Sequence, residues 1–174
     1  SIGDFWVVNR QGQPERPLLT SIIDAATRCV MYAAYTENGR AAEISGLLFH
    51  AIRRISDHWP MCGLPQTLVL DNGKVYKGRQ IKDQLADLGV IRVLAPPYFA
   101  QFKGKVERAF RTMHHGCELL LPGACGPDNK SGDLRAYPAE HFTQLPGGRW
   151  VDKRDGRGRE RDLYTLDQAN DILH

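Results

Sequence analysis

Two acidic residues stand where a metal-dependent site could form. Thr67–Leu70 is a short apolar run typical of a buried strand, and Asp71 follows it directly within an Asp-Asn-Gly sequence. Ligands of open α/β sheets gather beyond the carboxyl ends of the strands. Glu107 opens a later predicted helix, and thirty-five residues separate it from Asp71. Carboxylates are suitable ligands for Mg²⁺, and a pair of such ions can clamp a phosphodiester for in-line attack.

Both acids also have a simple structural interpretation. Asp-Asn-Gly is a good turn sequence by itself, and a Glu in the first turn of a helix is favoured by the helix dipole. The spacing alone therefore leaves a turn and a metal site as alternatives. Basic residues that could hold phosphates surround both acids. They are Lys74, Lys77, Lys103, Lys105, Arg108 and Arg111.

Hydrophobic periodicity predicts the elements that position these residues. The order is three strands, then a helix, a strand, a helix, a strand and a long helix. Strands are expected over 5–8, 18–23, 29–35, 67–70 and 90–94, and helices over 41–55, 79–88 and 105–120. The first three strands are close enough to form an antiparallel meander, whereas strands separated by helices should run parallel to a neighbour. The prediction is an α/β fold with a mixed five-stranded sheet flanked by helices.

The composition is that of an ordinary globular protein. The 174 residues carry a formal net charge of +3, which permits nucleic-acid binding without requiring it. We expect one domain over 1–121 and an irregular extension over 122–174, where Thr165 and Gln168 form a capping box for a short helix. The four cysteines lack zinc-ligand spacing and should be reduced thiols. With neither a signal peptide nor an apolar run of about 20 residues, the chain is expected to be soluble and intracellular.

Three segments of the chain together resemble one known family. LLTSIIDAATRCV, LVLDNG and PPYFAQFKGKVERAF are similar to the catalytic core of retroviral integrases and DDE transposases, including the bacteriophage Mu type. The resemblance covers about residues 4–121. It implies an RNase H-like fold and three acids that hold two divalent cations, Mg²⁺ or Mn²⁺. The second and third acids of that family correspond to Asp71 and Glu107.

The position of the first acid is left open by the sequence. The family places it on the first strand, where Asp4 is the provisional match. Counting back from Arg16 with the usual hairpin length instead places it just before Ser1, and this fragment would then lack its first acid. Asp24 matches a non-catalytic aspartate of the family and is set aside.

The resemblance also implies an activity and its partners. The chain would be the core of a polynucleotidyl transferase that cleaves DNA strands with water and then transfers them. Its partners would be DNA ends and target DNA, held through the six basic residues named above. The active form would be a homo-oligomer in the bacterial cytoplasm, associated with the nucleoid and not with a membrane. Two alternatives remain: a nuclease of the same fold without strand transfer, and an inactive transposase domain that binds DNA or protein.

Overall fold

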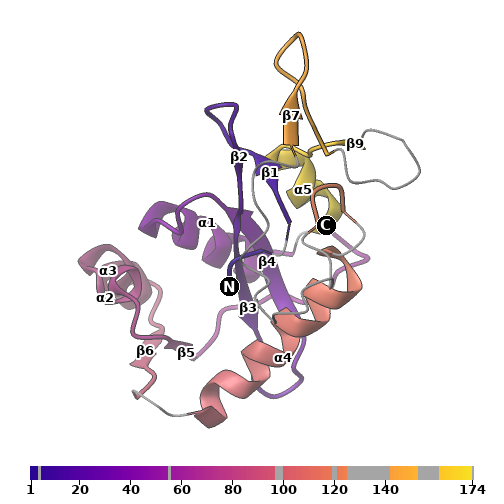
Figure 1. Ribbon diagram of the computed structural model, residues 1–174. Coiled ribbons are helices and arrows are strands. Elements are labelled where there is room, and N and C mark those ends of the chain that lie inside the picture. Colours follow the sequence, from indigo (N-terminus) through magenta and orange to yellow (C-terminus); the bar gives the residue numbers. More distant parts are fainter. Residues whose placement is uncertain are drawn as a thin grey trace. The chain divides into compact units, whose positions relative to one another are not determined.

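The computed structural model describes residues 1–3, 5–54, 56–96, 100–118, 121–124, 142–152 and 161–173, with the backbone alone at 100–103, 152 and 161. The chain divides into two compact units, and each unit is discontinuous in sequence. The first comprises Ser1–Leu19, Tyr35–Asn38 and Phe110–His174, and the second comprises Thr20–Ala34 and Gly39–Ala109. Figure 1 shows the elements along the chain.

The second unit contains a parallel strand pair that is joined by helices. β5 (Thr67–Leu70) pairs with β6 (Ile91–Leu94), with Thr67 opposite Ile91 and Leu70 opposite Leu94. Parallel strands need a crossover, which α2 (Lys74–Lys77) and α3 (Arg79–Asp87) supply. The sequence predicted β5 with the observed bounds, the parallel pairing and α3, but it did not predict the short helix α2.

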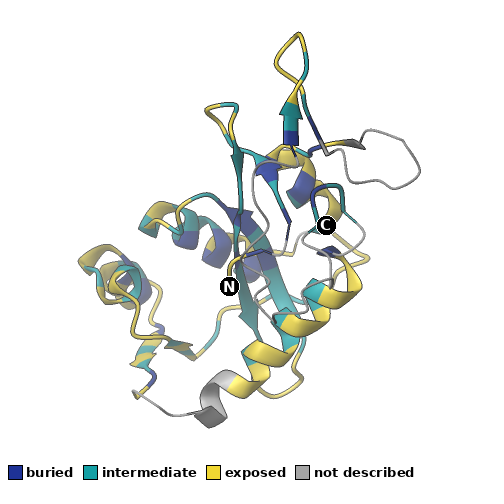
Figure 2. Ribbon diagram, in the orientation of Figure 1, coloured by how far each residue is buried: buried dark blue, intermediate teal, exposed yellow. Residues whose placement is uncertain are grey.

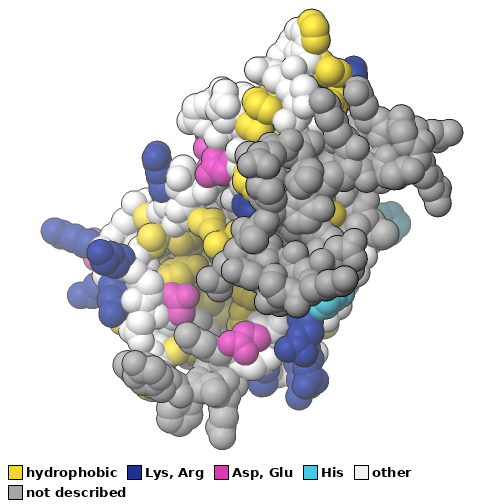
Figure 3. All heavy atoms as spheres, in the orientation of Figure 1, with side chains coloured by type: hydrophobic (Ala, Val, Ile, Leu, Met, Phe, Trp, Pro, Cys, Tyr) yellow, Lys and Arg dark blue, Asp and Glu magenta, His cyan; other side chains and the backbone are white. Residues whose placement is uncertain are grey.

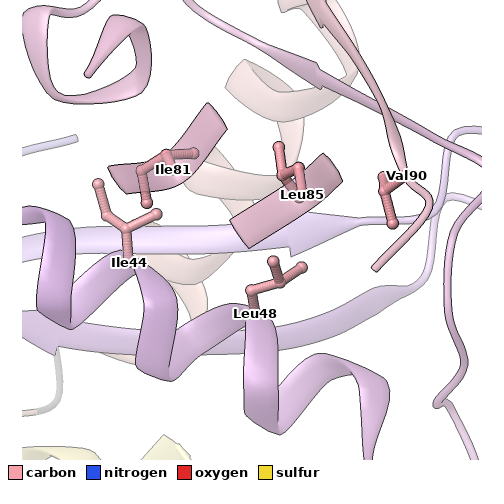
Figure 4. Packing of buried hydrophobic residues seen from close by; sticks show 5 residues of the cluster. All are labelled: Ile44, Leu48, Ile81, Leu85 and Val90. Atoms are coloured by element: carbon pink, nitrogen blue, oxygen red, sulfur yellow. The ribbon is translucent and has the colours of Figure 1, made fainter. Parts of the chain in front are cut away.

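The core of the second unit lies between two helices. Ile44 and Leu48 come from α1 (Ala41–Ile52), and Ile81 and Leu85 come from α3. Each pair is four residues apart, which places both side chains on one helix face, and Figure 4 shows the two faces meeting with Val90 beside them. Leu68 and Leu70 of β5 pack against this cluster. The core therefore fixes β5, the strand that Asp71 directly follows.

Within the described part of the chain, the strands over 18–23, 30–36, 67–70 and 91–94 do not join into one sheet. β3 (Leu18–Ile23) pairs with β4 (Val30–Thr36), and β5 pairs only with β6. A groove of about 900 Å³ lined by Ser21, Ile23, Leu68 and Leu70 separates β3 from β5. Figure 3 shows hydrophobic side chains, in yellow, where this surface is hollowed.

The prediction of a single five-stranded sheet is therefore not met by the described residues. Their strands form four small sheets, of two, two, two and three strands. A groove lined by residues of both strands lies between β3 and β5, and these two strands form no ladder with each other. The mixed α/β class is confirmed.

The first unit begins with a hairpin. β1 (Val7–Val8) pairs with β2 (Pro14–Glu15), and Ile2 forms an antiparallel bridge with Leu18. The first strand is shorter than predicted because Phe5 leaves the hairpin to bridge Ala124. Phe5 is fully buried and packs edge-to-face on Tyr35, with ring centroids 4.9 Å apart.

A buried carboxylate lies beside this aromatic pair. Glu118 is 0% exposed, and its Oε1 accepts a hydrogen bond of 2.8 Å from the Tyr35 hydroxyl. Its Oε2 pairs with His114 Nδ1, one turn earlier on the chain. Burial of the phenol, reinforced by the charge of Glu118, raises the pKa of Tyr35 above its usual range. Glu118 is thus a structural residue of the first unit.

The chain after residue 122 is more regular than predicted. β7 (Phe142–Gln144), β8 (Trp150–Asp152) and β9 (Arg161–Asp162) form an antiparallel sheet. Gly147 and Gly148 have positive φ and make the turn between β7 and β8. The short final helix, α5 (Leu166–Leu173), is confirmed with its capping box, since Thr165 and Gln168 exchange backbone-to-side-chain hydrogen bonds of 2.9 and 3.2 Å.

Two smaller expectations can also be compared with the structure. Cys29, Cys62 and Cys117 are free thiols, as predicted, and Cys125 lies outside the described residues. Within the described part of the chain, no helix is long and apolar enough to cross a bilayer.

Candidate functional site

Asp71 lies at the carboxyl end of β5 and is held in a defined turn. Its Oδ1 accepts a 2.7 Å hydrogen bond from the backbone N–H of Gly73, which forms the Asx turn that the sequence predicts. Asn72 Nδ2 donates to the Ala95 carbonyl over 2.6 Å, and the Ala95 N–H donates to the Leu70 carbonyl over 2.8 Å. The turn is therefore tied to the end of the neighbouring strand β6. The Asp71 side chain remains exposed at this edge of the sheet.

The turn leaves no room for a side chain at Gly73. A Cβ atom there would lie 2.8 Å from Asp71 Oδ1 and 3.2 Å from the ring of Tyr76. Burial, with a smaller contribution from the Asp71 charge, raises the pKa of Tyr76. The phenol therefore stays neutral next to the carboxylate and can act as a hydrogen-bond donor. This neighbour of Asp71 was not predicted from the sequence.

Glu107 lies on α4 (Ala100–Gly116), and its side chain is exposed. The sequence placed it in the first turn of a helix starting near Lys105, but the helix starts at Ala100. Gly104 was taken as part of the preceding loop, yet a single Gly inside a helix costs only about 1 kcal/mol. Glu107 is therefore two turns from the helix start, and the helix dipole does not explain its position.

One of the predicted phosphate ligands has a structural contact. Lys105 Nζ donates a 2.6 Å hydrogen bond to the carbonyl of Ala25, in the turn after β3. The neighbouring Asp24 accepts hydrogen bonds from the hydroxyl and the N–H of Thr27, and these bonds lower its pKa. This turn also contains Arg28, whose φ of 66° lies in the left-handed region. Asp24 thus stabilises a turn, and its exclusion from the metal ligands stays a prediction.

The other basic candidates lie on two helices. Lys74 and Lys77 are exposed on α2, directly after the Asp71 turn, and Figure 3 shows dark-blue side chains around α2 and α3. Arg108 and Arg111 are exposed on α4, one and four residues after Glu107. Lys103 also belongs to α4, although its side chain lies outside the described residues.

The structure describes two of the three predicted metal ligands. Asp71 and Glu107 belong to the same compact unit. Asp4 lies outside the described residues, so its position relative to them is a prediction that stays untested. Among the residues that are described, no three His, Cys, Asp or Glu side chains converge in a group that could hold a metal ion. The Asp71 carboxylate can nevertheless accept further bonds, because Gly73 uses only part of its acceptor capacity.

Comparison with known proteins shows one family match and similarity to transposases. Residues 1–123 match the family described as the TnsB C-terminal domain. The transposase for transposon Tn552 of Staphylococcus aureus is 25% identical over 133 residues, which cover 75% of this chain and 28% of that protein. The transposon Tn7 transposition protein TnsB of Escherichia coli is 25% identical over 139 residues, which cover 71% of this chain and 20% of TnsB.

A retroviral protein is also similar. The Gag-Pol polyprotein of Rous sarcoma virus subgroup C (strain Prague) is 24% identical over 140 residues, which cover 74% of this chain and 8% of the polyprotein. The chain thus spans less than a third of each of these relatives. The family match, by contrast, covers well over half of the chain and includes both Asp71 and Glu107. The chain therefore belongs to the TnsB C-terminal domain family.

Proposed function

We propose that this chain is the catalytic core of a DDE recombinase, with an RNase H-like fold, that cleaves and joins DNA strands. The observation that carries the proposal is the exposed Asp71 carboxylate, fixed at the carboxyl ends of the parallel strands β5 and β6. Rigid placement on a sheet edge is what a metal-ligating carboxylate requires. The order of strands and helices, and the similarity to two transposases and a retroviral polyprotein, support the same conclusion.

The donor set fits a hard divalent cation. Asp71 and Glu107 offer carboxylate oxygens, and a first-strand aspartate, Asp4 or one just before Ser1, would complete the set. The bare Cα of Gly73 leaves the space beside Asp71 Oδ1 that any side chain would fill. Two bound Mg²⁺ or Mn²⁺ ions would supply charge neutralisation at the scissile phosphate and activation of the attacking oxygen.

The residues of the chain perform the remaining tasks. Gly73 N–H and the Asn72–Ala95 bond orient the Asp71 carboxylate before substrate binds. Lys74 and Lys77 can bind phosphates of the DNA next to the scissile position, as can Arg108 and Arg111 on α4, because phosphate contacts position the duplex without reading its sequence. Lys105 holds α4 to the turn after β3, which fixes the helix that carries Glu107. In the full protein we expect a homo-oligomer that acts on paired DNA ends.

Substitutions that keep side-chain shape test the proposal in the full-length protein. Asp71→Asn and Glu107→Gln should each abolish Mg²⁺-dependent cleavage of a DNA end. Asp87→Asn, an exposed aspartate of α3 in the same unit, is the matched control and should cleave normally. If either of the first two variants still cleaves DNA, the acid that it replaces is not a metal ligand.

Two alternatives to the recombinase are distinguished by further assays. A pre-cut DNA end offered with target DNA measures strand transfer directly, and hydrolysis without transfer would identify a nuclease of the same fold. An inactive DNA- or protein-binding domain would show neither reaction, and its DNA affinity would be unchanged by Glu107→Gln.

A further inference from the structure

The outer face of α1 carries aromatic and basic side chains that the core does not use. We call Tyr32, Phe49, His50 and Arg53 the aromatic–arginine surface. All four lie in the second unit, and none belongs to the metal or phosphate candidates. Phe49 is 53% exposed, and His50 and Arg53 are also exposed. Figure 2 shows α1 buried on one side and exposed on the other.

The helix explains why these side chains face water. α1 buries Ile44, Leu47, Leu48 and Ala51, which form one stripe along the helix. Phe49 and His50 are not part of that stripe and point away from the core. Arg53 follows Phe49 by four residues, so the two side chains can meet on one face. Fully exposing a Phe side chain forgoes about 1.5–3 kcal/mol of burial free energy, so a half-exposed ring here gives little to folding. The exposed part of the Phe49 ring is therefore available for a contact outside the fold.

The rings already have the geometry of a stack. Tyr32 and His50 lie face to face, with centroids 4.9 Å apart and planes inclined by only 15°. Phe49 stands at 78° to His50, and the guanidinium carbon of Arg53 lies 4.8 Å from the Phe49 ring centroid. A third flat ring can extend the Tyr32–His50 stack from the exposed His50. A positive charge then stands one helical turn from that ring.

We propose that the aromatic–arginine surface binds an unpaired nucleobase of DNA, stacked on His50, with Arg53 at the adjacent phosphate. Nucleic acid is favoured over a protein partner because the existing pair is parallel, as stacked bases are, and because Arg53 places a positive charge beside the rings. Arg54 is already paired with Asp57 over 3.0 Å, which leaves the charge of Arg53 to set the sign of the surface. Base stacking together with nearby cations is the usual means of holding single strands without sequence preference.

The inference rests on the proposed function for the class of ligand, but it does not use Asp71 or Glu107. Unpaired bases arise wherever a DNA end is opened or bent for joining. A stacking surface in the same unit as Asp71 would hold such a base during the reaction. It would therefore contribute to affinity for single-stranded and frayed DNA, and little to affinity for intact duplex.

The test uses the full-length protein and an oligothymidine with one central 2-aminopurine, whose fluorescence is quenched by stacking. Binding by the unaltered protein should quench the probe. His50→Ala should abolish the quenching and weaken single-strand binding about tenfold, as expected for the loss of one base stack. His50→Phe keeps a flat ring without the imidazole, and it should retain both the quenching and most of the affinity.

Two further measurements, binding to a blunt duplex and the assembly state of the protein, distinguish the possible outcomes. Binding to duplex should be unchanged in His50→Ala, and its folding can be verified by thermal unfolding. If the unaltered protein binds duplex but His50→Ala still quenches the probe, the stacking inference is wrong while the proposed function stands. If no DNA binds at all, both fail. If His50→Ala and Phe49→Ala leave DNA binding intact but change the sedimentation coefficient, the surface is a protein interface and the proposal is overturned.

Discussion

Removing the Glu118 carboxylate should strongly destabilise the first unit. Glu118 is 0% exposed, Tyr35 is 2% exposed, and the His114 side chain is 14% exposed, so all three polar groups are shielded from water. Glu118→Ala leaves the Tyr35 hydroxyl and His114 Nδ1 without their acceptor. Each shielded donor left without its acceptor costs about 1–3 kcal/mol, so the loss of both bonds should cost on the order of 3–5 kcal/mol.

The effect can be measured by urea unfolding followed through tryptophan fluorescence, since Trp6 and Trp150 lie in the same unit. A loss of about 3–5 kcal/mol corresponds to a fall in Tm of roughly 6–20 °C for a chain of this size. Glu118→Gln keeps one oxygen acceptor for Tyr35 and should cost less, about 1–2 kcal/mol.

The matched control is Glu107→Gln, an exposed glutamate on α4, for which the free energy of unfolding should change by less than about 0.5 kcal/mol. The reasoning would be refuted if Glu118→Ala cost no more than Glu107→Gln. That result would mean that the carboxylate is solvated rather than enclosed with Tyr35 and His114.

Three further predictions follow from contacts within single units. Because the pKa of Tyr35 is raised in the folded state, the free energy of unfolding should fall above pH 10, by up to about 1.4 kcal/mol per pH unit. Tyr35→Phe should remove this fall from unfolding curves measured between pH 9 and 11. Gly73→Ala should lower cleavage without unfolding the chain, because the added methyl displaces Asp71; unchanged kcat would argue against a fixed carboxylate. Lys74→Ala with Lys77→Ala should reduce the slope of log affinity against log salt by about 1.8 for duplex DNA, and an equal slope would place the phosphates elsewhere.

The sequence predicted best the elements whose signals are local. β3 and β5 have the predicted bounds because each is rich in apolar and β-branched residues, with Ser21 the one exception in β3. The capping box of α5 was predicted because its two partners are three residues apart. The start of α4 was missed because Gly104 was taken for a loop residue, although the helix continues through it.

Contacts between distant residues could not be predicted in the same way. Glu118 stands just before three leucines, with no local signal of a partner, and the tyrosine that encloses it is 83 positions away. The bond from Lys105 to Ala25 spans 80 positions, so the sequence interpreted Lys105 only as a phosphate ligand. The aromatic–arginine surface likewise joins β4 to α1 through Tyr32 and His50. A single sequence carries no record of such pairs, because packing alone brings them together.

The turn and the metal ligand are compatible interpretations of Asp71 rather than alternatives. The hydrogen bond from Gly73 uses Oδ1 and thereby fixes the orientation of the carboxylate, while the exposed side chain keeps acceptor capacity for a cation. An asparagine at position 71 could accept the same bond and keep the turn, but it would lack the negative charge. Asp71→Asn therefore separates the two roles in one molecule: unchanged unfolding shows that the turn persists, and the loss of cleavage then isolates the contribution of the charge. A residue that served the turn alone would tolerate the exchange in both measurements.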